Sequence, residues 1–155
     1  GRSIAVTAEG TIYITGQTDG TLSGQTSAGG RDGLVARYST NGTLVWAKQF
    51  GTASLDEGQG IAIAPNGSIY VTGETNAALF GQPFAGGSDA FFAQFAPNGD
   101  RLSAQQIGTA QADESYNLTI DSAGNLYVIG QTLGTFPGQS SAGSYDAWIA
   151  KYTPT

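Results

Sequence analysis

Aspartates recur in this chain at a fixed step of 57 residues. Asp32, Asp89 and Asp146 each follow a stretch of small residues, and Asp56 and Asp113 recur with the same step in the connections between repeats. A carboxylate repeated in this way could bind Ca²⁺ together with loop carbonyl groups, since Ca²⁺ prefers oxygen ligands. It could instead accept hydrogen bonds from backbone N–H groups and fix a loop. No Asp-x-Asp-x-Asp cage is present, so loop capping is favoured, and Ca²⁺ is the only cofactor left open.

Two other kinds of residue could contact a ligand. Gln25, Gln82 and Gln139 lie beside a repeated glycine, where an amide could bind a sugar or close the loop by an internal hydrogen bond; the internal bond is favoured. Trp46 aligns with Ser103 in a strand expected at the outer edge, where it could stack on a sugar or on a neighbouring molecule.

The residues that are absent exclude several classes of function. The chain contains no His and no Cys, which removes Ser-His-Asp and Cys-His nucleophiles, disulfides and thiolate metal sites. The net charge is −6, and the six Lys and Arg residues are scattered, so we expect no nucleic-acid partner. No apolar run approaches the ~18 residues of a membrane span, and we expect no membrane insertion.

The elements that must position these residues are short strands. Residues 10–18 return as 67–75 and 124–132 without a gap, and each repeat contains four apolar runs. In the first repeat the runs are 4–7, 12–15, 33–38 and 43–50, with Asn41-Gly42 as a hairpin turn before the last. We label the four expected strands a, b, c and d. They form an antiparallel meander, as in a β-propeller blade. A two-sheet sandwich is the alternative, but it would not need a gapless triplication.

The repeats define three blades in one partial propeller domain, 1–57, 58–114 and 115–155. Strand c is apolar on both sides, which predicts sheets covered on both faces, as stacked blades are. Trp148 aligns with Leu34 and Phe91 and is expected in the core. The predicted loops place most acidic residues at one end of the blades, namely Asp19, Asp32, Asp56, Glu57, Glu74, Asp89, Asp113, Glu114 and Asp146.

Two motifs resemble the bacterial beta-propeller repeat family, SBBP, and more loosely NHL-type blades. They are Gly-Ile-Ala-Ile-Ala-Pro-Asn-Gly-Ser-Ile-Tyr-Val-Thr-Gly at 60–73 and Gly-Gly-Ser-Asp-Ala-Phe-Phe-Ala-Gln-Phe-Ala-Pro-Asn-Gly at 86–99. The resemblance implies a propeller in a secreted or cell-surface bacterial protein, and it implies no particular activity. The chain departs from the family pattern in its middle loop, where only Phe136-Pro137 matches the usual aromatic-Pro pair.

The third repeat lacks strand d, because Thr155 aligns with Asn41 and Asn98 of the hairpin turns. We therefore expect an open edge on the strand at 145–152. This edge would be filled by self-association, most simply of two arcs into a six-bladed ring, or by a longer parent propeller.

Three functions follow from these observations. The first is a non-catalytic module at the cell surface for protein interaction or self-assembly, and this one is preferred. The second is a carbohydrate-binding propeller, for which Trp46 and the loop glutamines would contact the glycan. The third is a fragment of a metal-dependent enzyme, ranked last because chemistry usually breaks repeat symmetry and the loops here keep it.

Overall fold

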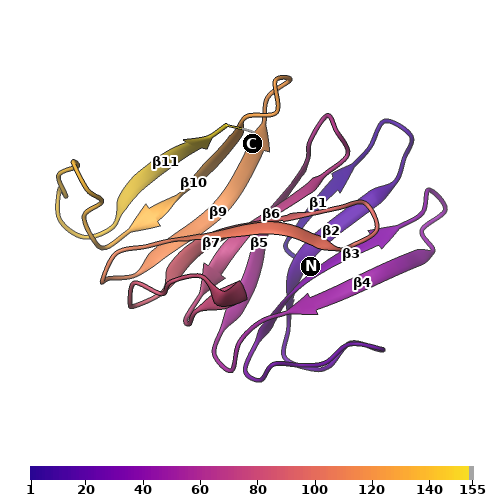
Figure 1. The fold of residues 1–155 in the computed structure, drawn as a ribbon, viewed down its shortest axis with the longest axis horizontal. Helices are drawn as coiled ribbons and strands as arrows, with labels where there is room; N and C mark the ends of the chain where they lie inside the picture. The colour runs from indigo at the N-terminus through magenta and orange to yellow at the C-terminus, as the bar shows by residue number, and fades with distance from the viewer. Residues whose placement is uncertain (154–155) are drawn as a thin grey trace.

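Three antiparallel sheets lie side by side in the computed structural model, which describes residues 1–153. Indigo and purple mark the first sheet in Figure 1, and orange and yellow mark the third. Blade 1 contains β1 (Ser3–Val6), β2 (Ile12–Thr18), β3 (Asp32–Tyr38) and β4 (Leu44–Phe50). Blade 2 contains β5 (Asp56–Ile63), β6 (Ile69–Thr75), β7 (Asp89–Phe95) and β8 (Arg101–Ile107). Blade 3 contains β9 (Asp113–Ile120), β10 (Leu126–Thr132) and β11 (Asp146–Tyr152).

The strands of each blade follow one another in chain order, as a meander does. The prediction of an all-β fold with three repeated sheets, the last lacking its outer strand, is confirmed. The second and third sheets begin at Asp56 and Asp113, two residues before the predicted boundaries. The sequence placed these two aspartates in the connections between repeats, whereas the structure places them at the first position of a strand.

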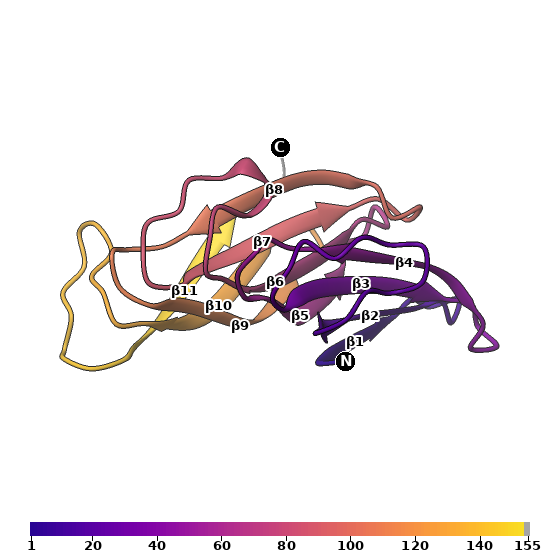
Figure 2. The same ribbon diagram turned by 90° about the horizontal axis from the view of Figure 1, so that it is seen from below.

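The first strand of each following blade packs across the sheet before it. β5 lies against β1, β2 and β3, and β9 lies against β5, β6 and β7. Both views show this arrangement, with blade 2 between the other two sheets (Figures 1 and 2). One short 3-10 helix, η1 (Leu79–Gly81), interrupts the loop between β6 and β7. Within residues 1–153 no helix is long and apolar enough to cross a membrane.

The hydrophobic core lies between blades. Tyr13, Val35 and Phe50 of blade 1 pack against a set that includes Phe91 and Phe95 of blade 2. The Phe50 and Phe91 rings meet edge to face, with centroids 5.9 Å apart. A second cluster joins Phe92 of blade 2 to Leu118, Leu126 and Val128 of blade 3. Sheets with two apolar faces therefore need neighbours on both sides, which explains the apolar pattern of strand c.

Trp148 is only partly buried, so its predicted place in the core is wrong. Its ring packs against the second cluster, and its indole N–H donates to the carbonyl of Gln131 at 3.0 Å. The equivalent Phe91 is 1% exposed because it packs against Phe50 and Phe80. The smaller Ile107 and Pro137 stand at the corresponding positions for Trp148.

Buried aspartates fasten the start of β5 and β9 to the preceding connection. Asp56 is fully buried, and its Oδ2 accepts hydrogen bonds from the Thr52 N–H at 2.6 Å and the Thr52 hydroxyl at 2.8 Å. Its Oδ1 accepts a third bond from the Thr75 hydroxyl. Asp113 is bound in the same way by Thr109, at 2.6 and 2.8 Å.

Replacing Asp56 by Ala should lower the free energy of unfolding by about 3 kcal/mol, because three hydrogen bonds are lost and buried donors stay unpaired. Urea denaturation followed by circular dichroism measures the change. Asp100 is an exposed turn residue. Asp100→Ala should change stability by less than about 0.5 kcal/mol. Equal losses for the two variants would contradict the role given to Asp56.

Candidate functional site

Asp32, Asp89 and Asp146 occupy the same place at the start of β3, β7 and β11. In each case Oδ2 accepts a hydrogen bond from the backbone N–H four residues earlier, at 3.0, 2.8 and 3.0 Å. The carboxylates thus cap the loops that precede these strands. Among residues 1–153 no group of three or more His, Cys, Asp and Glu side chains is arranged to hold a metal ion. Binding of Ca²⁺ stays a prediction.

A glutamine of the outer strand completes each of the first two of these loops. The Gln106 Nε2 donates to Asp89 Oδ2 at 2.9 Å and to the Ala77 carbonyl at 3.0 Å. Its Oε1 accepts the Leu79 N–H at 3.0 Å. One carboxamide therefore bonds to the capping aspartate and to both polar groups of the loop backbone; we call this arrangement the glutamine clamp.

Blade 1 contains the same glutamine clamp. Gln49 donates to Asp32 Oδ2 at 2.7 Å and to the Gly20 carbonyl at 3.0 Å, and it accepts the Leu22 N–H at 2.8 Å. We did not predict a role for these two glutamines from the sequence, although their step of 57 residues was a visible signal.

Burial works against the charge of the clamped aspartate. It raises the pKa of the Asp89 carboxyl, and the hydrogen bonds from Ala85 and Gln106 oppose this rise. Gly108 lies against the same carboxylate, since a Cβ there would stand 2.2 Å from Asp89 Oδ1. Gly51 takes the same position beside Asp32, at 2.1 Å. The second residue after the clamp glutamine must therefore be glycine.

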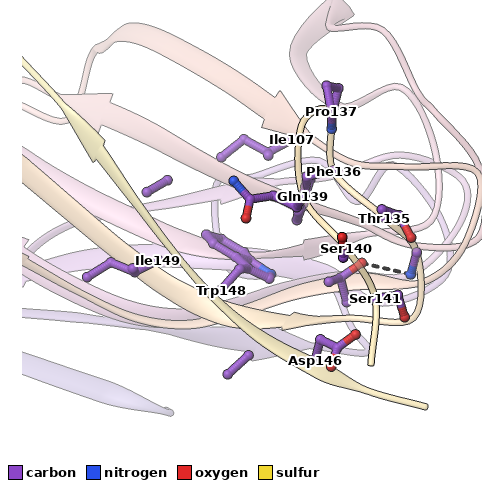
Figure 3. Close-up of a pocket in the computed structure, with 14 residues that line it drawn as sticks. Ile107, Thr135, Phe136, Pro137, Gln139, Ser140, Ser141, Asp146, Trp148 and Ile149 are labelled. Carbon is purple, nitrogen blue, oxygen red and sulfur yellow. Dashed lines mark hydrogen bonds between the residues drawn. The ribbon is translucent and has the colours of Figure 1, made fainter. Parts of the chain in front are cut away.

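In blade 3 the corresponding space is a groove of about 470 Å³. Its lining includes Gly134, Phe136 and Asp146, which are equivalent to Ala77, Leu79 and Asp89 of the clamp in blade 2. Figure 3 shows the labelled members of this set around the groove, with the Trp148 ring between Phe136 and β11. Phe136 and Trp148 meet edge to face at 6.0 Å between centroids. The described part of blade 3 contributes no clamp glutamine.

The three predicted loop glutamines differ in their contacts. Gln25 bonds within its loop through the Gly24 carbonyl at 3.0 Å, and its Oε1 accepts the Gln49 N–H at 3.2 Å. Gln82 follows η1, and its backbone N–H bonds to the Leu79 carbonyl. Gln139 lines the groove of blade 3. A sugar ligand for these glutamines stays a prediction.

Trp46 connects blades 1 and 2. Its indole N–H donates to the Pro97 carbonyl at 3.0 Å, and its ring lies 6.1 Å from that of Tyr13. The side chain is partly buried, so the indole donor and much of the ring are already in use. Trp46 and the groove residues lie in different blades, and the structure does not bring Trp46 together with Gln139.

A second polar cluster lies near the ends of β5, β6 and β9. Glu57 and Glu74 stand directly opposite each other in the β5–β6 ladder. Glu57 pairs with Arg2 at 3.2 Å and with Arg31, and the Glu114 carboxylate accepts the Gln131 amide at 3.0 Å. Burial first, and then the charges of Glu114 and Glu57, raise the pKa of Glu74 to about 7.

Glu74 is the point at which this position departs from the repeat, because blades 1 and 3 have Gln17 and Gln131 there. A carboxyl group with a pKa near 7 exchanges protons near neutral pH. This asymmetry was visible in the sequence, but we drew no prediction from it.

The raised pKa predicts a pH-dependent stability. Glu74 has an ordinary pKa of 4.5 and a folded-state pKa of about 7, so the folded chain binds the proton more tightly between these values. The free energy of unfolding should therefore fall as pH rises from about 4.5 to 7. Glu74→Gln should remove this slope and add on the order of 1 kcal/mol at pH 8, since partial solvent exposure weakens the effect.

Urea denaturation from pH 4 to pH 8 measures this slope. Glu9 is exposed, and Glu9→Gln is the control that should keep the slope of the parent chain. An unchanged slope in Glu74→Gln would show that another group titrates.

Comparisons with known proteins agree with this geometry. The family model of the beta-propeller repeat matches residues 45–81 and 104–137, which run from the outer strand of one blade into the loop after the second strand of the next. The chain is also 27% identical over 161 residues to the regulatory protein FlaEY of Caulobacter vibrioides. That alignment covers 97% of this chain and only 17% of the relative. The chain thus contains repeats of the beta-propeller repeat family, SBBP.

Proposed function

We propose that the chain is a non-catalytic interaction module that associates through the free faces of blades 1 and 3. The observation that carries the proposal is the exposure, at both ends of the arc, of apolar faces that are buried wherever two blades meet. Large exposed apolar faces are typical of interaction surfaces.

The free face of blade 1 presents the residues that blade 2 buries against it. Ile61 of β5 is 5% exposed, but its equivalent Ile4 is 63% exposed. Ile69 is fully buried in the core between the blades, whereas its equivalent Ile12 is only partly buried. This face therefore has the side chains of a blade interface without a neighbour in the described chain.

The free face of blade 3 has the complementary character. Ile149 is 70% exposed, whereas Phe92 at the same position of blade 2 is 8% exposed and packs on blade 3. Ile129 is 46% exposed and replaces the fully buried Thr72. An isoleucine in place of a threonine makes this face more apolar than its counterparts. Because the two free faces differ, one copy would meet the next head to tail, and a ring forms if the rotation closes.

The non-catalytic part of the proposal has separate support. The recurring aspartates accept hydrogen bonds that hold loops, and the chain has no His or Cys to act as a nucleophile or base. The relative that spans this chain is named a regulatory protein. A location outside the cell, which the resemblance to SBBP proteins implies, is part of the proposal and rests on that resemblance alone.

The solution mass tests the proposal. Sedimentation or light scattering should give at least twice the mass of one chain, and Ile4→Glu should reduce it to that of a monomer by placing a charge in the interface. Ile4 is exposed, so the variant should fold as the parent does.

Val45→Glu is the matched control. Val45 is 51% exposed on β4, and its equivalent Leu102 is 56% exposed on β8, so their exposure does not depend on a free blade face. This variant should keep the parent mass. A parent chain that stays monomeric at all concentrations, with an intact β-sheet circular dichroism spectrum, would contradict the proposal.

A further inference from the structure

We propose that the free edge of β11 and the groove beside it form an acceptor site for an extended peptide supplied by another chain, with the pattern Ala-x-Gln-(Phe or Ile)-Gly-Thr. The inference rests on the proposed interaction function and names the chemistry of one partner. It concerns the outer edge of blade 3, a different surface from the blade faces.

The backbone of β11 is available for pairing on one side. β3 and β7 each pair with two neighbours, the second and fourth strands of their sheets. β11 is the last strand of its sheet and pairs only with β10 among the described strands. An edge strand with unpaired backbone groups accepts a further strand by β-augmentation.

The groove already contains the partners of a clamp glutamine. In blade 2 the Gln106 carboxamide bonds to Asp89 Oδ2, to the Ala77 carbonyl and to the Leu79 N–H, at 2.9 to 3.0 Å. The equivalent groups in blade 3 belong to Asp146, Gly134 and Phe136, and all three residues line the groove.

The groove is also held in shape without its clamp. The Asp146 carboxylate accepts the Ala142 N–H at 3.0 Å, as its counterparts do in blades 1 and 2. One carboxylate acceptor, one carbonyl acceptor and one N–H donor match the two donors and one acceptor of a primary amide.

The two complete blades define the rest of the ligand. Ala47 lies opposite Ala36, and Ala104 lies opposite Ala93, so a small residue of the ligand would face Ala150. The clamp glutamine is followed by an apolar residue, a glycine and a threonine in both blades, in the sequences Gln-Phe-Gly-Thr at 49–52 and Gln-Ile-Gly-Thr at 106–109.

Each of these last residues has a physical reason. Phe50 and Ile107 pair with Gly33 and Ala90, and the corresponding residue of the ligand would stand opposite Ala147. A side chain at the glycine position would collide with the capping carboxylate, because a Cβ added to Gly51 or Gly108 would lie 2.1 or 2.2 Å from the aspartate Oδ1.

A separate chain must supply this segment within the described structure. The two segments that have the pattern, β4 and β8, are already paired in their own sheets. Releasing either one to fill blade 3 would open blade 1 or blade 2 and expose its core.

Binding of a synthetic peptide tests the site. A fluorescently labelled peptide with the sequence of residues 101–109, Arg-Leu-Ser-Ala-Gln-Gln-Ile-Gly-Thr, is titrated into the folded chain and followed by anisotropy. Saturable binding is expected. A peptide with the Gln106→Leu change should bind about tenfold more weakly or worse, because it leaves the Asp146 carboxylate without its amide donor.

Changes in the peptide cannot unfold the protein, so they keep the test decisive. Asp146→Ala in the protein should weaken binding by a similar factor, and Asp100→Ala should not. No binding of the parent peptide, or equal binding of the Gln106→Leu peptide, would overturn the acceptor site. So would a glycan that binds in place of the peptide and is lost in Asp146→Ala.

The Ile4→Glu variant separates this inference from the proposed function. Its change lies on β1, away from β11, and it should bind the peptide as the parent does. Peptide binding by a parent chain that never self-associates would leave the acceptor site standing and refute association through the faces. Self-association without peptide binding would do the reverse.

Discussion

The packing of one sheet face on the next is the interaction on which this structure depends. No blade has a core of its own, because each sheet is apolar on both sides and its large side chains meet those of a neighbour. Phe50 illustrates the arrangement, since it belongs to blade 1 but lies against Phe80, Phe91 and Phe95 of blade 2. Stability in such an array comes mainly from nearest-neighbour contacts, so the end blades are necessarily the least satisfied.

The polar interactions determine where each sheet begins and how its loops are held. Asp56 and Asp113 attach the first strand of a blade to the preceding connection, and Asp32 and Asp89 attach the loop before the third strand to the outer strand through a glutamine. Buried carboxylates are costly unless they accept several hydrogen bonds, and these receive two or three each. The repeat of 57 residues therefore preserves a hydrogen-bonding pattern as well as a hydrophobic one.

Much of the fold could be predicted from the sequence, because local signals and the repeat agreed. Alternating apolar runs and the Asn41-Gly42 turn predicted the strands, and their gapless recurrence predicted equal sheets. The burial of Trp148 could not be predicted from its alignment with Phe91, since it depends on Ile107 and Pro137 in the neighbouring segments. The contact of Trp46 with Pro97 was hidden for the same reason, as it crosses between blades.

The candidate site was predicted in part. The recurring aspartates were found because they keep their spacing, but their glutamine partners lie in another strand and required the three-dimensional pairing. The two blade interfaces also differ in bulk, with Phe50 and Phe80 at the first and Ile107 and Pro137 at the second. Side-chain volume at this point sets how far one sheet tilts from the next. The curvature of the arc, and with it the number of sheets that completes a circle, is therefore encoded in a few residues beside the third strand.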